Sequence, residues 1–433
     1  MSIEALDPAG AGLARSSLGE TRVIGGLPGD VVSALFVSTP GRPPRAIAER
    51  ILSPSADRRD PPCPIVGECG ACPWMALSDA AQSEWKTEIA ARALDGIARV
   101  RPIHTSPHLV QYRNRTVLPV ERHRGRIRIG YYRPRTHEVV DVAWCSVLAA
   151  PLQRAFEAVR QAIEIARPSA YDERWRHGVL RRVALRAGVR TDDLLVTLVS
   201  PKEGAEELGR LVDSLKELLD TDASIAVNIQ PSAGNAVFGS KTRVVSGRGF
   251  VRERIRGRSV HLAATTFFQL NTDVAETLFE RVLELAGDLQ GARAADLYAG
   301  IGLVGLDLAD AGADEVTIVE RAEASLEEAR RLADGNTKIR ILEGDAATVL
   351  PTVGPLDIAI TDPPRRGLGD DGVEAILANP PARIVHIACD ISAMARDLLA
   401  LTAGPYRVEG DVELFDMLPQ TAHLEAVAVL VRE

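Results

Sequence analysis

The sequence predicts a multidomain protein with a small N-terminal β barrel or sheet, a central α+β domain and a C-terminal α/β domain. Short apolar runs (TRVIG, VVSALFV, RAIAERIL) separated by turn signals (AGAG, GGLPGD, TPGRPP) fill residues 1–55 and favour the barrel. After Phe267, strand and helix patterns alternate regularly. That alternation is typical of a doubly wound parallel sheet. We expect domains at residues 1–55, 56–262 and 263–433.

The central domain begins after a linker rich in proline and charge, ILSPSADRRDPPCP. A helical pattern runs from Met75, with Ser78 or Asp79 near its start. A second helix is expected from Pro151 to about Ala166. The remaining segments have strand patterns: RTVLPVERH, RIRIGYYRP, EVVDVAW, LRRVALRAG, DLLVTLVS, SIAVNIQ, AVFGS (residues 236–240) and SVHLAAT.

The C-terminal domain has strand patterns at ARAADLYAG, EVTIVER, KIRILEGDA, LDIAITDPP and RIVHIACD. Helical patterns lie at TLFERVLELA, GLVGLDLADA, EASLEEARRLA and SAMARDLLALT. Two further strand patterns, Val412–Asp416 and Glu425–Val431, have no helix between them. We therefore expect them to form an antiparallel hairpin.

The composition excludes some function classes. Hydrophobic residues make up 46% of the 433-residue chain and charged residues 25%, as in ordinary globular proteins. No apolar run approaches the length of a membrane-spanning helix, so no membrane partner is expected. The start, MSIEALDPAGAG, lacks the basic and apolar regions of a signal peptide. We expect a cytoplasmic monomer without structural disulfides.

The net charge of −8 is the sum of two unlike parts. Residues 263–433 hold 30 Asp and Glu against 13 Lys and Arg, whereas residues 1–262 hold 29 against 38. The segment Arg101–His137 contains nine arginines and one acidic residue, Glu121, with Tyr112, Tyr131 and Tyr132 between them. Arginines with aromatic residues favour phosphate contacts and base stacking, and so nucleic-acid binding. The alternative is a solvated, strand-rich surface.

Four of the five cysteines form a set, Cys63, Cys69, Cys72 and Cys145. Three of them fall within ten residues, in a stretch punctuated by glycine and proline that can wrap around a bound group. In a reducing compartment such thiols favour an iron–sulfur cluster or zinc. Zinc sites more often use two C-x2-C pairs, and this chain has only one. Unrelated free thiols are the remaining alternative.

Several residues at strand ends of the C-terminal domain are candidate cofactor ligands. After Asp296, the turn containing Gly300 and Gly302 lets a ligand approach a helix N-terminus. Glu320, at the end of the next strand, is placed to bind ribose hydroxyls, and Asp345 follows the third strand. Nicotinamide, flavin and S-adenosylmethionine enzymes all use such turns, and each acid alone is more often a solvated side chain.

Three residues farther along are candidates for chemistry. Asp362, in TDPPRRG, follows the fourth strand and is expected to point into the crevice, although DPP also reads as a rigid turn. Cys389 lies between the fifth strand and a helix. It is either a small buried hydrophobe or a nucleophile whose pKa the helix N-terminus lowers and Asp390 raises. Glu425 is either a general base or a surface charge.

Taken in order, these segments resemble the S-adenosylmethionine-dependent RNA uracil-5 methyltransferases, in the iron–sulfur branch that acts on 23S ribosomal RNA. The matching segments are GGLPGDVV, ILSPSADR, C-x5-CGAC, YRNR, IGYYRPRTHEVVDV-x2-C, NIQPSAGN, FFQLN, DLYAGIG, DPPRRG, ACDISAMARD and LPQTAHLE. They run nearly end to end along the chain, and their common order is specific where each alone is not.

The resemblance implies a TRAM domain (an OB-like RNA-binding barrel), a central domain with a 4Fe–4S cluster and a Rossmann-like class I methyltransferase domain. It implies metal ligands at Cys63, Cys69, Cys72 and Cys145. It also implies cofactor contacts from Gln269, Tyr298, Glu320 and Asp362, with Cys389 as nucleophile and Glu425 as base. The expected substrate is a uridine of large-subunit ribosomal RNA, methylated at C5 through a covalent adduct between cysteine and uracil C6.

The chain departs from the family pattern at a few positions. ACDI replaces the usual SCNP around the nucleophile, so Asp390 and Ile391 stand for Asn and Pro. CGAC replaces CGGC, and Leu303 takes a position that is usually polar. The alternatives are a tRNA uridine-C5 methyltransferase, a methyltransferase of a base amino group, and a non-catalytic RNA-binding protein with a degenerate methyltransferase domain. A hydride-transferring oxidoreductase is disfavoured because the third glycine of its pattern is absent.

Overall fold

The computed structural model describes residues 1–37, 43–234 and 236–433, which divide into two compact units. Unit 1 comprises Met1–Pro62, Cys72–Pro107 and Asp273–Glu433, and unit 2 comprises Cys63–Ala71 and His108–Thr272. The three domains expected from the sequence remain a prediction. Among the helices described, none is long and apolar enough to cross a membrane.

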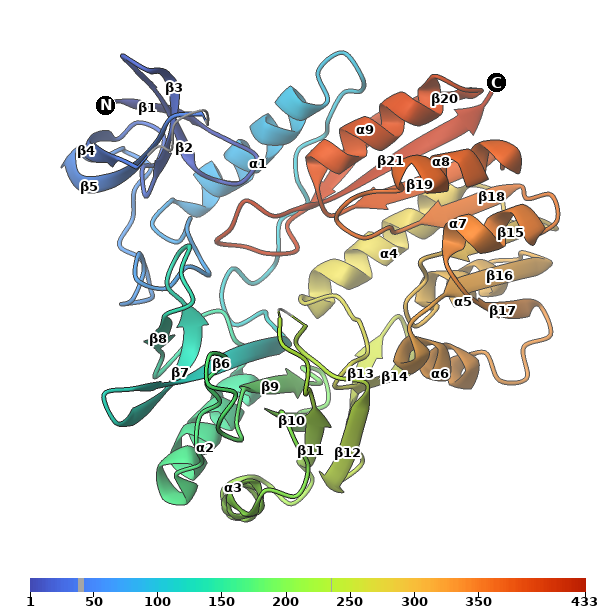
Figure 1. Cartoon of the computed structure of the whole chain (residues 1–433). Coiled ribbons are helices and arrows are strands. Elements are labelled where there is room, and N and C mark those ends of the chain that lie inside the picture. The colour runs from blue at the N-terminus through green and yellow to red at the C-terminus, as the bar shows by residue number, and fades with distance from the viewer. Residues whose placement is uncertain (38–42, 235) are drawn as a thin grey trace. The chain divides into compact units, whose positions relative to one another are not determined.

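The N-terminal part of unit 1 is a five-stranded barrel (Figure 1). Its strands are β1 (Ile3–Leu6), β2 (Gly12–Ser16), β3 (Gly19–Ile24), β4 (Val31–Phe36) and β5 (Arg45–Ser53), in the order β1-β2-β3-β5-β4. A bridge between Ser2 and Val31 joins the two edges. A small barrel is therefore present where the sequence predicted an antiparallel barrel or sheet, although β3 pairs with β5 in parallel. Most of the expected TPGRPP turn lies outside the described residues.

Helix α1 (Asp79–Ala93) follows the barrel in unit 1. The Ser78 side chain accepts a hydrogen bond from the backbone N–H of Ala81 and caps the helix, as the sequence indicated. Met75 and Ala76 lie in a turn and Leu77 forms an isolated bridge with Arg58, so the helix is shorter than its pattern. Its buried face carries Ala81, Ile89 and Ala90, together with two polar residues, Gln82 and Lys86.

The C-terminal part of unit 1 is a seven-stranded sheet in the order β17-β16-β15-β18-β19-β21-β20 (Figure 1). The strands are β15 (Arg293–Leu297), β16 (Glu315–Glu320), β17 (Ile339–Glu343), β18 (Ile358–Thr361), β19 (Arg383–Ala388), β20 (Tyr406–Phe415) and β21 (Glu425–Arg432). The first five strands are parallel, and β21 is antiparallel to both β19 and β20. The doubly wound sheet and the terminal hairpin are both confirmed.

Helices connect these strands: α4 (Thr272–Ala286), α5 (Leu303–Asp310), α6 (Glu323–Leu332), α7 (Ala346–Val349), a 3-10 turn η1 (Leu350–Thr352), α8 (Gly369–Ala378) and α9 (Ile391–Thr402). The helical patterns predicted four of them, α4, α5, α6 and α9. Helix α4 precedes β15, and because crossovers are right-handed and the strand order reverses between β15 and β18, the connecting helices lie on both faces of the sheet.

Unit 2 is built on a second seven-stranded sheet, in the order β12-β11-β10-β9-β6-β7-β8, with a separate hairpin of β13 and β14. The strands are β6 (Arg115–His123), β7 (Arg126–Tyr132), β8 (Val139–Asp141), β9 (Arg182–Ala187), β10 (Leu194–Ser200), β11 (Ser224–Ile229), β12 (Lys241–Ser246), β13 (Phe250–Ile255) and β14 (Arg258–Ala263). Helices α2 (Ala150–Ala166) and α3 (Glu206–Leu218) bury their apolar faces in its core.

Two details of the central prediction are wrong or incomplete. The segment AVFGS, predicted as a strand, is irregular, and the strand begins just after it at Lys241. The glycine there explains the difference, because a Cβ at Gly239 would lie 1.8 Å from the backbone oxygen of Ile229. The chain at that point packs closely against β11 before it starts to pair regularly. Helix α3 and strand β13 were not predicted.

Candidate functional site

The carboxyl ends of the parallel strands in unit 1 gather five of the residues predicted from the sequence. Tyr298 follows β15, Glu320 ends β16, Asp362 follows β18 and Cys389 follows β19. Glu425 begins β21, and because β21 runs antiparallel to β19, its first residue lies at the same edge of the sheet. The strand order reverses between β15 and β18, the position where open α/β sheets bind ligands.

The glycine-rich turn after β15 brings the start of α5 close to the side chain of Ile318 in β16. Tyr298, Gly300 and Gly302 all have positive φ angles, of 61°, 56° and 76°. A Cβ at Gly305 would lie 2.6 Å from a side-chain carbon of Ile318, so only glycine lets α5 pack this closely on β16. The turn thus places the N-terminus of α5 at the edge of the sheet where the candidate residues gather.

Glu320 fixes that turn through its carboxylate. Its Oε2 accepts a hydrogen bond from Gly300 N at 2.8 Å, and its Oε1 accepts bonds from Arg321 N and Ala322 N, both at 2.7 Å. Each carboxylate oxygen has lone pairs for further bonds, so Glu320 can hold the turn and still accept bonds from ligand hydroxyls. Beside it, Asp345 caps α7 by accepting a bond from Ala347 N.

Tyr298 lies between two elements at this edge. A Cβ added to Gly372 of α8 would be 3.3 Å from the Tyr298 hydroxyl, so the side chain reaches that helix. Burial and the negative charge of Asp345 raise the pKa of Tyr298 to about 12. The ring is half-buried and uncharged, and it offers an apolar face together with one hydroxyl.

The carboxyl groups of Asp362 and Glu425 lie near the thiol of Cys389 and form an acidic cluster with it. The last residue pair between β19 and β21 is Ala388 with Ala426, so Cys389 and Glu425 are the next facing positions. Burial, with repulsion from Asp362, raises the pKa of Glu425 well above its usual range, and Arg365 opposes the shift. Burial raises the pKa of Asp362 to about 7. Glu425 Oε2 is buried and has no hydrogen-bond partner among the described residues.

The sequence analysis set two opposing effects on the pKa of Cys389, from the helix N-terminus and from Asp390, and neither is the main one. Burial raises the pKa of this thiol to about 12, with further contributions from Glu425 and Asp362. Asp390, which the sequence indicated as the opposing charge, is the N-cap of α9, and its carboxylate accepts bonds from Ser392 N and Ala393 N at 2.9 Å. The dominant charges around the sulfur therefore come from other strands, which the local sequence does not reveal.

Residues beneath this group were missed by the sequence analysis. His386 is fully buried on β19, and its Nδ1 lies 2.7 Å from the Thr361 hydroxyl, next to Asp362. Its Nε2 is 3.2 Å from Asp397 Oδ2, without the alignment of a hydrogen bond. Asp397 accepts a bond from Leu368 N and so holds the end of the DPPRRG loop. The signal that could have identified His386 from the sequence is its position within an otherwise apolar strand pattern.

Gln269, the remaining predicted cofactor residue, belongs to unit 2. It is buried, and its backbone oxygen accepts a hydrogen bond from Asn114 Nδ2 at 2.8 Å. The side chain of Asn114 also bonds Thr272, so the FFQLN segment is fixed at its base within unit 2. A role for Gln269 in a cofactor site stays a prediction.

Three of the four clustered cysteines lie in unit 2. Burial raises the pKa of Cys63 and of Cys69, and the neighbouring Cys145 adds to both shifts. Cys145 Sγ is 3.8 Å from the Tyr131 hydroxyl. Cys72 belongs to unit 1, and all four thiols are half-buried and free of disulfides.

The donor chemistry of the half-buried thiols of Cys63, Cys69 and Cys145 fits a soft metal or an iron–sulfur cluster, and a bound cation would offset the repulsion between their thiolates. Among the described residues, no group of three or more His, Cys, Asp or Glu is arranged to hold a metal ion.

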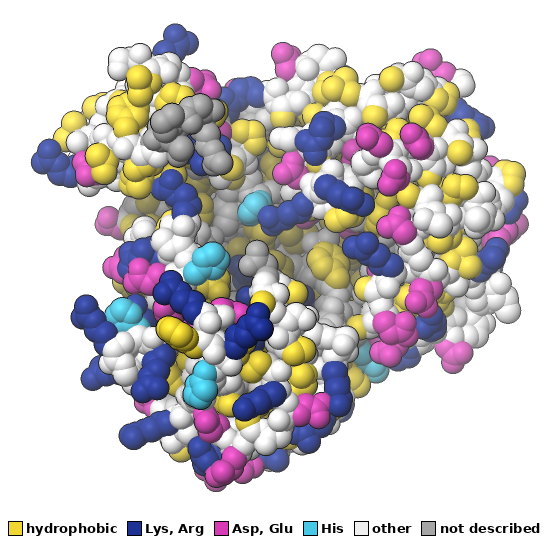
Figure 2. All heavy atoms as spheres, viewed as in Figure 1, with side chains coloured by type: hydrophobic (Ala, Val, Ile, Leu, Met, Phe, Trp, Pro, Cys, Tyr) yellow, Lys and Arg dark blue, Asp and Glu magenta, His cyan; other side chains and the backbone are white. Residues whose placement is uncertain are grey.

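The basic segment, most of which lies in unit 2, exposes some of its arginines (Arg122, Arg124, Arg126 and Arg135) and only part of its tyrosines, whereas burial lowers the pKa of Arg115. Tyr112 is buried, and Tyr131 is half-buried with its hydroxyl bonded to Thr116. Tyr132 is the exposed member of the three, at 37%. Figure 2 shows Lys and Arg side chains over much of the face of unit 2 turned to the viewer.

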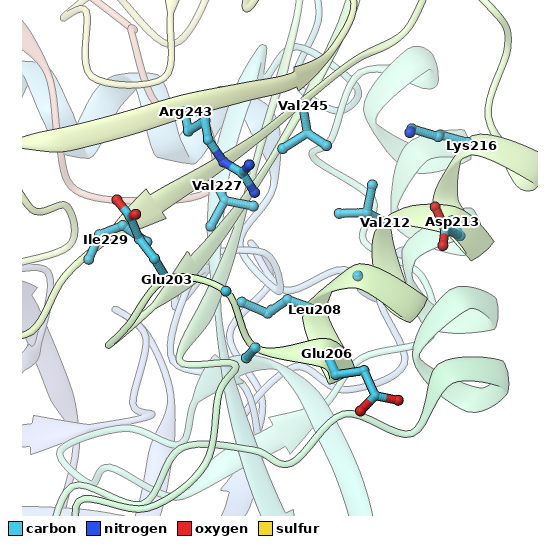
Figure 3. A pocket seen from close by; sticks show the side chains of 13 residues that line it. Glu203, Glu206, Leu208, Val212, Asp213, Lys216, Val227, Ile229, Arg243 and Val245 are labelled. Atoms are coloured by element: carbon cyan, nitrogen blue, oxygen red, sulfur yellow. The ribbon is translucent and has the colours of Figure 1, made fainter.

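A cavity of about 350 Å³ in unit 2 lies between α3 and strands β11 and β12. Figure 3 shows Leu208 and Val212 of α3 on one side of it and Val227 and Val245 of the strands on the other. None of the predicted catalytic, cofactor or metal residues lines this cavity. The candidate chemistry therefore does not lie here.

Comparisons with known proteins give a consistent result. No family model matches the chain. An uncharacterized RNA methyltransferase of Synechocystis is 34% identical, covering 99% of this chain and 95% of that protein. One from Halalkalibacterium halodurans is 30% identical, covering 99% and 96%. The crystal structure of Pyrococcus abyssi tRNA (uracil-54, C5)-methyltransferase with S-adenosyl-L-homocysteine matches with a TM-score of 0.79 and 27% identity, covering 99% of this chain and 98% of that one.

Proposed function

The chain belongs to the RNA methyltransferase family and is a class I, S-adenosylmethionine-dependent enzyme, and we propose that it methylates C5 of a uridine through a covalent cysteine adduct. The observation that carries this proposal is the facing placement of Cys389 and Glu425 at the carboxyl edge of the sheet. A nucleophile beside a carboxylate is what the chemistry at C5 requires. The similarity to a uracil-C5 methyltransferase over nearly the whole chain supports it.

Uracil C5 is a poor nucleophile, so the reaction needs covalent activation. The thiolate of Cys389 adds to C6, and the electrons of the C5–C6 double bond move into an enolate. C5 then takes the methyl group from the sulfonium of S-adenosylmethionine, whose S–CH3 bond breaks. Glu425 removes the C5 proton, the double bond re-forms, and the C6–S bond breaks to release the thiolate.

The resting state suits this sequence of steps. A thiol with a pKa of about 12 is protonated at neutral pH and does not react indiscriminately. Its proton must leave to water when the uracil binds, so that the Glu425 carboxylate stays unprotonated for the later removal of the C5 proton. Arg365 lies close enough to lower the pKa of both groups, and its positive charge would also favour an enolate oxygen.

Glu320, Tyr298, Asp362 and Gln269 are proposed to bind S-adenosylmethionine. Glu320 would accept bonds from the ribose hydroxyls, because its carboxylate is already oriented by three backbone N–H groups. Tyr298 would contact the cofactor with its ring. Asp362 lies between the cofactor region and Cys389, and its negative charge would favour the cationic sulfonium over the neutral product. That difference helps the product leave.

We propose a 4Fe–4S cluster held by Cys63, Cys69, Cys72 and Cys145, with a structural role. The methyl transfer requires no electron, so no redox step is assigned to it. Anaerobic purification tests the assignment: iron and acid-labile sulfide in equal amounts, lost together in Cys69→Ser, support a cluster. Stoichiometric zinc without sulfide would replace it by the zinc alternative.

Large-subunit ribosomal RNA is the substrate we propose, with transfer RNA as the alternative. The basic surface of unit 2 supports an RNA substrate. Arg252 and Arg254 point outward from β13 while Val251, Glu253 and Ile255 point inward, and the rings of Phe250 and His261 stack beside them at 4.2 Å. Such a surface suits contacts to phosphates and unpaired bases. The target base must leave its stack to reach the crevice.

Mapping 5-methyluridine in RNA from cells with and without the gene tests the proposal. The expected result is loss of one or more 5-methyluridines from 23S ribosomal RNA. Loss from transfer RNA instead would establish the alternative substrate. An unchanged pattern in both RNAs, together with loss of a methyl group from a base nitrogen, would refute the proposed chemistry.

A further inference from the structure

Two polar residues on the buried face of α1 bind the loop that leads into Glu425. The loop, residues 416–424, connects β20 to β21 and ends at the proposed base. Gln82 is 2% exposed and Lys86 is fully buried. They lie four residues apart, on one face of the helix. Buried polar groups of this kind are costly unless all their hydrogen bonds are made, so their partners are informative.

Gln82 uses both ends of its carboxamide on the loop. Its Oε1 accepts a bond from Gln420 N at 2.9 Å, and its Nε2 donates to Gln420 Oε1, also at 2.9 Å. The same Nε2 lies within bonding distance of the Leu77 and Trp74 backbone oxygens. Gln420 has a φ of 71°, a left-handed conformation that glutamine rarely adopts. The reciprocal pair of bonds holds the loop in this strained form.

Lys86 holds the start of the loop. Its Nζ contacts Asp416 Oδ1 and donates to the backbone oxygen of Leu418 at 3.2 Å. Asp416, which directly follows β20, is 2% exposed. Trp74 adds a backbone bond from its N–H to the Gln420 oxygen at 3.1 Å. The loop is thus fixed at residues 416, 418 and 420 by α1 and Trp74, and Arg59 donates a further bond to Gln420 Oε1 at 2.9 Å.

We infer that Gln82 and Lys86 are positioning residues that fix the 416–424 loop and thereby hold the Glu425 carboxylate against Cys389. This inference rests on the proposed function, in which Glu425 removes the C5 proton. Glu425 Oε2 has no hydrogen-bond partner among the described residues, so no hydrogen bond at that oxygen sets the position of the carboxylate. Its placement depends on the backbone on either side, which is β21 after it and this loop before it.

The inference predicts a specific kinetic defect. Addition of Cys389 and methyl transfer precede proton removal, so a misplaced Glu425 slows the last step most. The methylated covalent adduct then accumulates. A well-placed general base contributes about 100-fold to 10,000-fold, and partial misplacement forfeits part of that. We expect a decrease of about 10-fold in proton release relative to methyl transfer.

The experiment uses RNA from cells lacking the gene, labelled with tritium at uracil C5, and S-adenosylmethionine labelled with 14C in the methyl group. A single turnover reports tritium release against methyl transfer, and a denaturing gel reports the adduct. Gln82→Leu is the principal variant. Asn379→Leu is the matched control, because it removes a carboxamide with three backbone hydrogen bonds elsewhere in unit 1.

A second variant separates positioning from stability. Lys86→Met combined with Asp416→Leu removes the buried charges together, which is often neutral for stability, yet it leaves Leu418 without its donor. We expect thermal denaturation to show that the double variant is folded, and we expect this variant still to accumulate the adduct. The inference is overturned if Gln82→Leu and the double variant both show the same ratio of tritium release to methyl transfer as the Asn379→Leu control. Wild-type protein that transfers methyl without releasing tritium would refute the proposed function itself.

Discussion

Cys389 and Glu425 occupy facing positions one residue beyond Ala388 and Ala426, which are the last pair between β19 and β21. They come from segments 36 positions apart in the numbering, and the antiparallel direction of β21 brings them to one edge. Burial raises the pKa of both groups, and the charge of Glu425 contributes to the shift at Cys389. The proposed nucleophile and the proposed base therefore lie together at one acidic, buried site.

The raised thiol pKa predicts slow alkylation of Cys389. The thiolate is the reactive form, so its fraction increases tenfold per pH unit below a pKa of about 12. The alkylation rate by iodoacetamide should therefore keep increasing from pH 7 to pH 10, measured by mass spectrometry on the peptide containing Cys389. Glu425→Gln removes a repelling charge, lowers the thiol pKa and accelerates the reaction. A rate that levels off near pH 8 would contradict the burial effect.

Glu425→Gln should stop the reaction after methyl transfer. The amide cannot take the C5 proton, so turnover should decrease by about 100-fold to 10,000-fold, the usual contribution of a general base. Methylated RNA should remain bound to the protein through denaturation, detected by gel electrophoresis with 14C-labelled cofactor. If this variant instead turns over at the wild-type rate, another group is the base.

Glu320 should determine cofactor affinity. Glu320→Gln keeps the size of the side chain but loses the negative charge that accepts bonds from Gly300, Arg321 and Ala322. Hydrogen bonds to charged groups contribute about 1.5–3 kcal/mol, so we expect binding of S-adenosyl-L-homocysteine to weaken by at least about 10-fold in calorimetry. Glu323→Gln, on the exposed first turn of α6, is the control and should bind normally. Equal affinities in both variants would exclude the ribose role.

Asp296 should make the protein less stable as the pH rises. Burial raises its pKa from 3.8 to about 7, so the folded state keeps a proton that the unfolded state has lost. Stability from this group is fully present below pH 3.8 and is lost as the pH increases to about 7. Asp296→Asn should therefore increase the free energy of unfolding at pH 8, by an amount on the order of 1–3 kcal/mol, and so raise the melting temperature at that pH. A lower melting temperature at pH 8 would contradict this sign.

The sequence predicted much of the fold because its signals are local. Strand ends, the glycine turn and the cap at Ser78 depend on neighbouring residues, and the structure confirms them. AVFGS failed because Gly239 packs against β11, a contact with no local signal. Helix α7, with four residues, is too short to show a period.

The electrostatics of the site could not be predicted from local sequence. Asp390 is adjacent to Cys389 in sequence but serves as a helix cap, whereas Glu425 and Asp362 come from other strands and raise the thiol pKa. From the sequence alone, Gln82 and Lys86 are recognisable only as polar residues that interrupt one face of a helix. Their partners, Gln420 and Asp416, lie more than 300 positions away.

Covalent trapping tests the central claim most directly. RNA containing 5-fluorouridine, incubated with the protein and S-adenosylmethionine, carries fluorine where the base would remove a proton, so the reaction stops at the adduct. The account predicts an RNA–protein band that survives denaturation, contains the transferred methyl group and disappears in Cys389→Ala. Methyl transfer to ordinary RNA that persists in Cys389→Ala, with no such band from the wild-type protein, would contradict it.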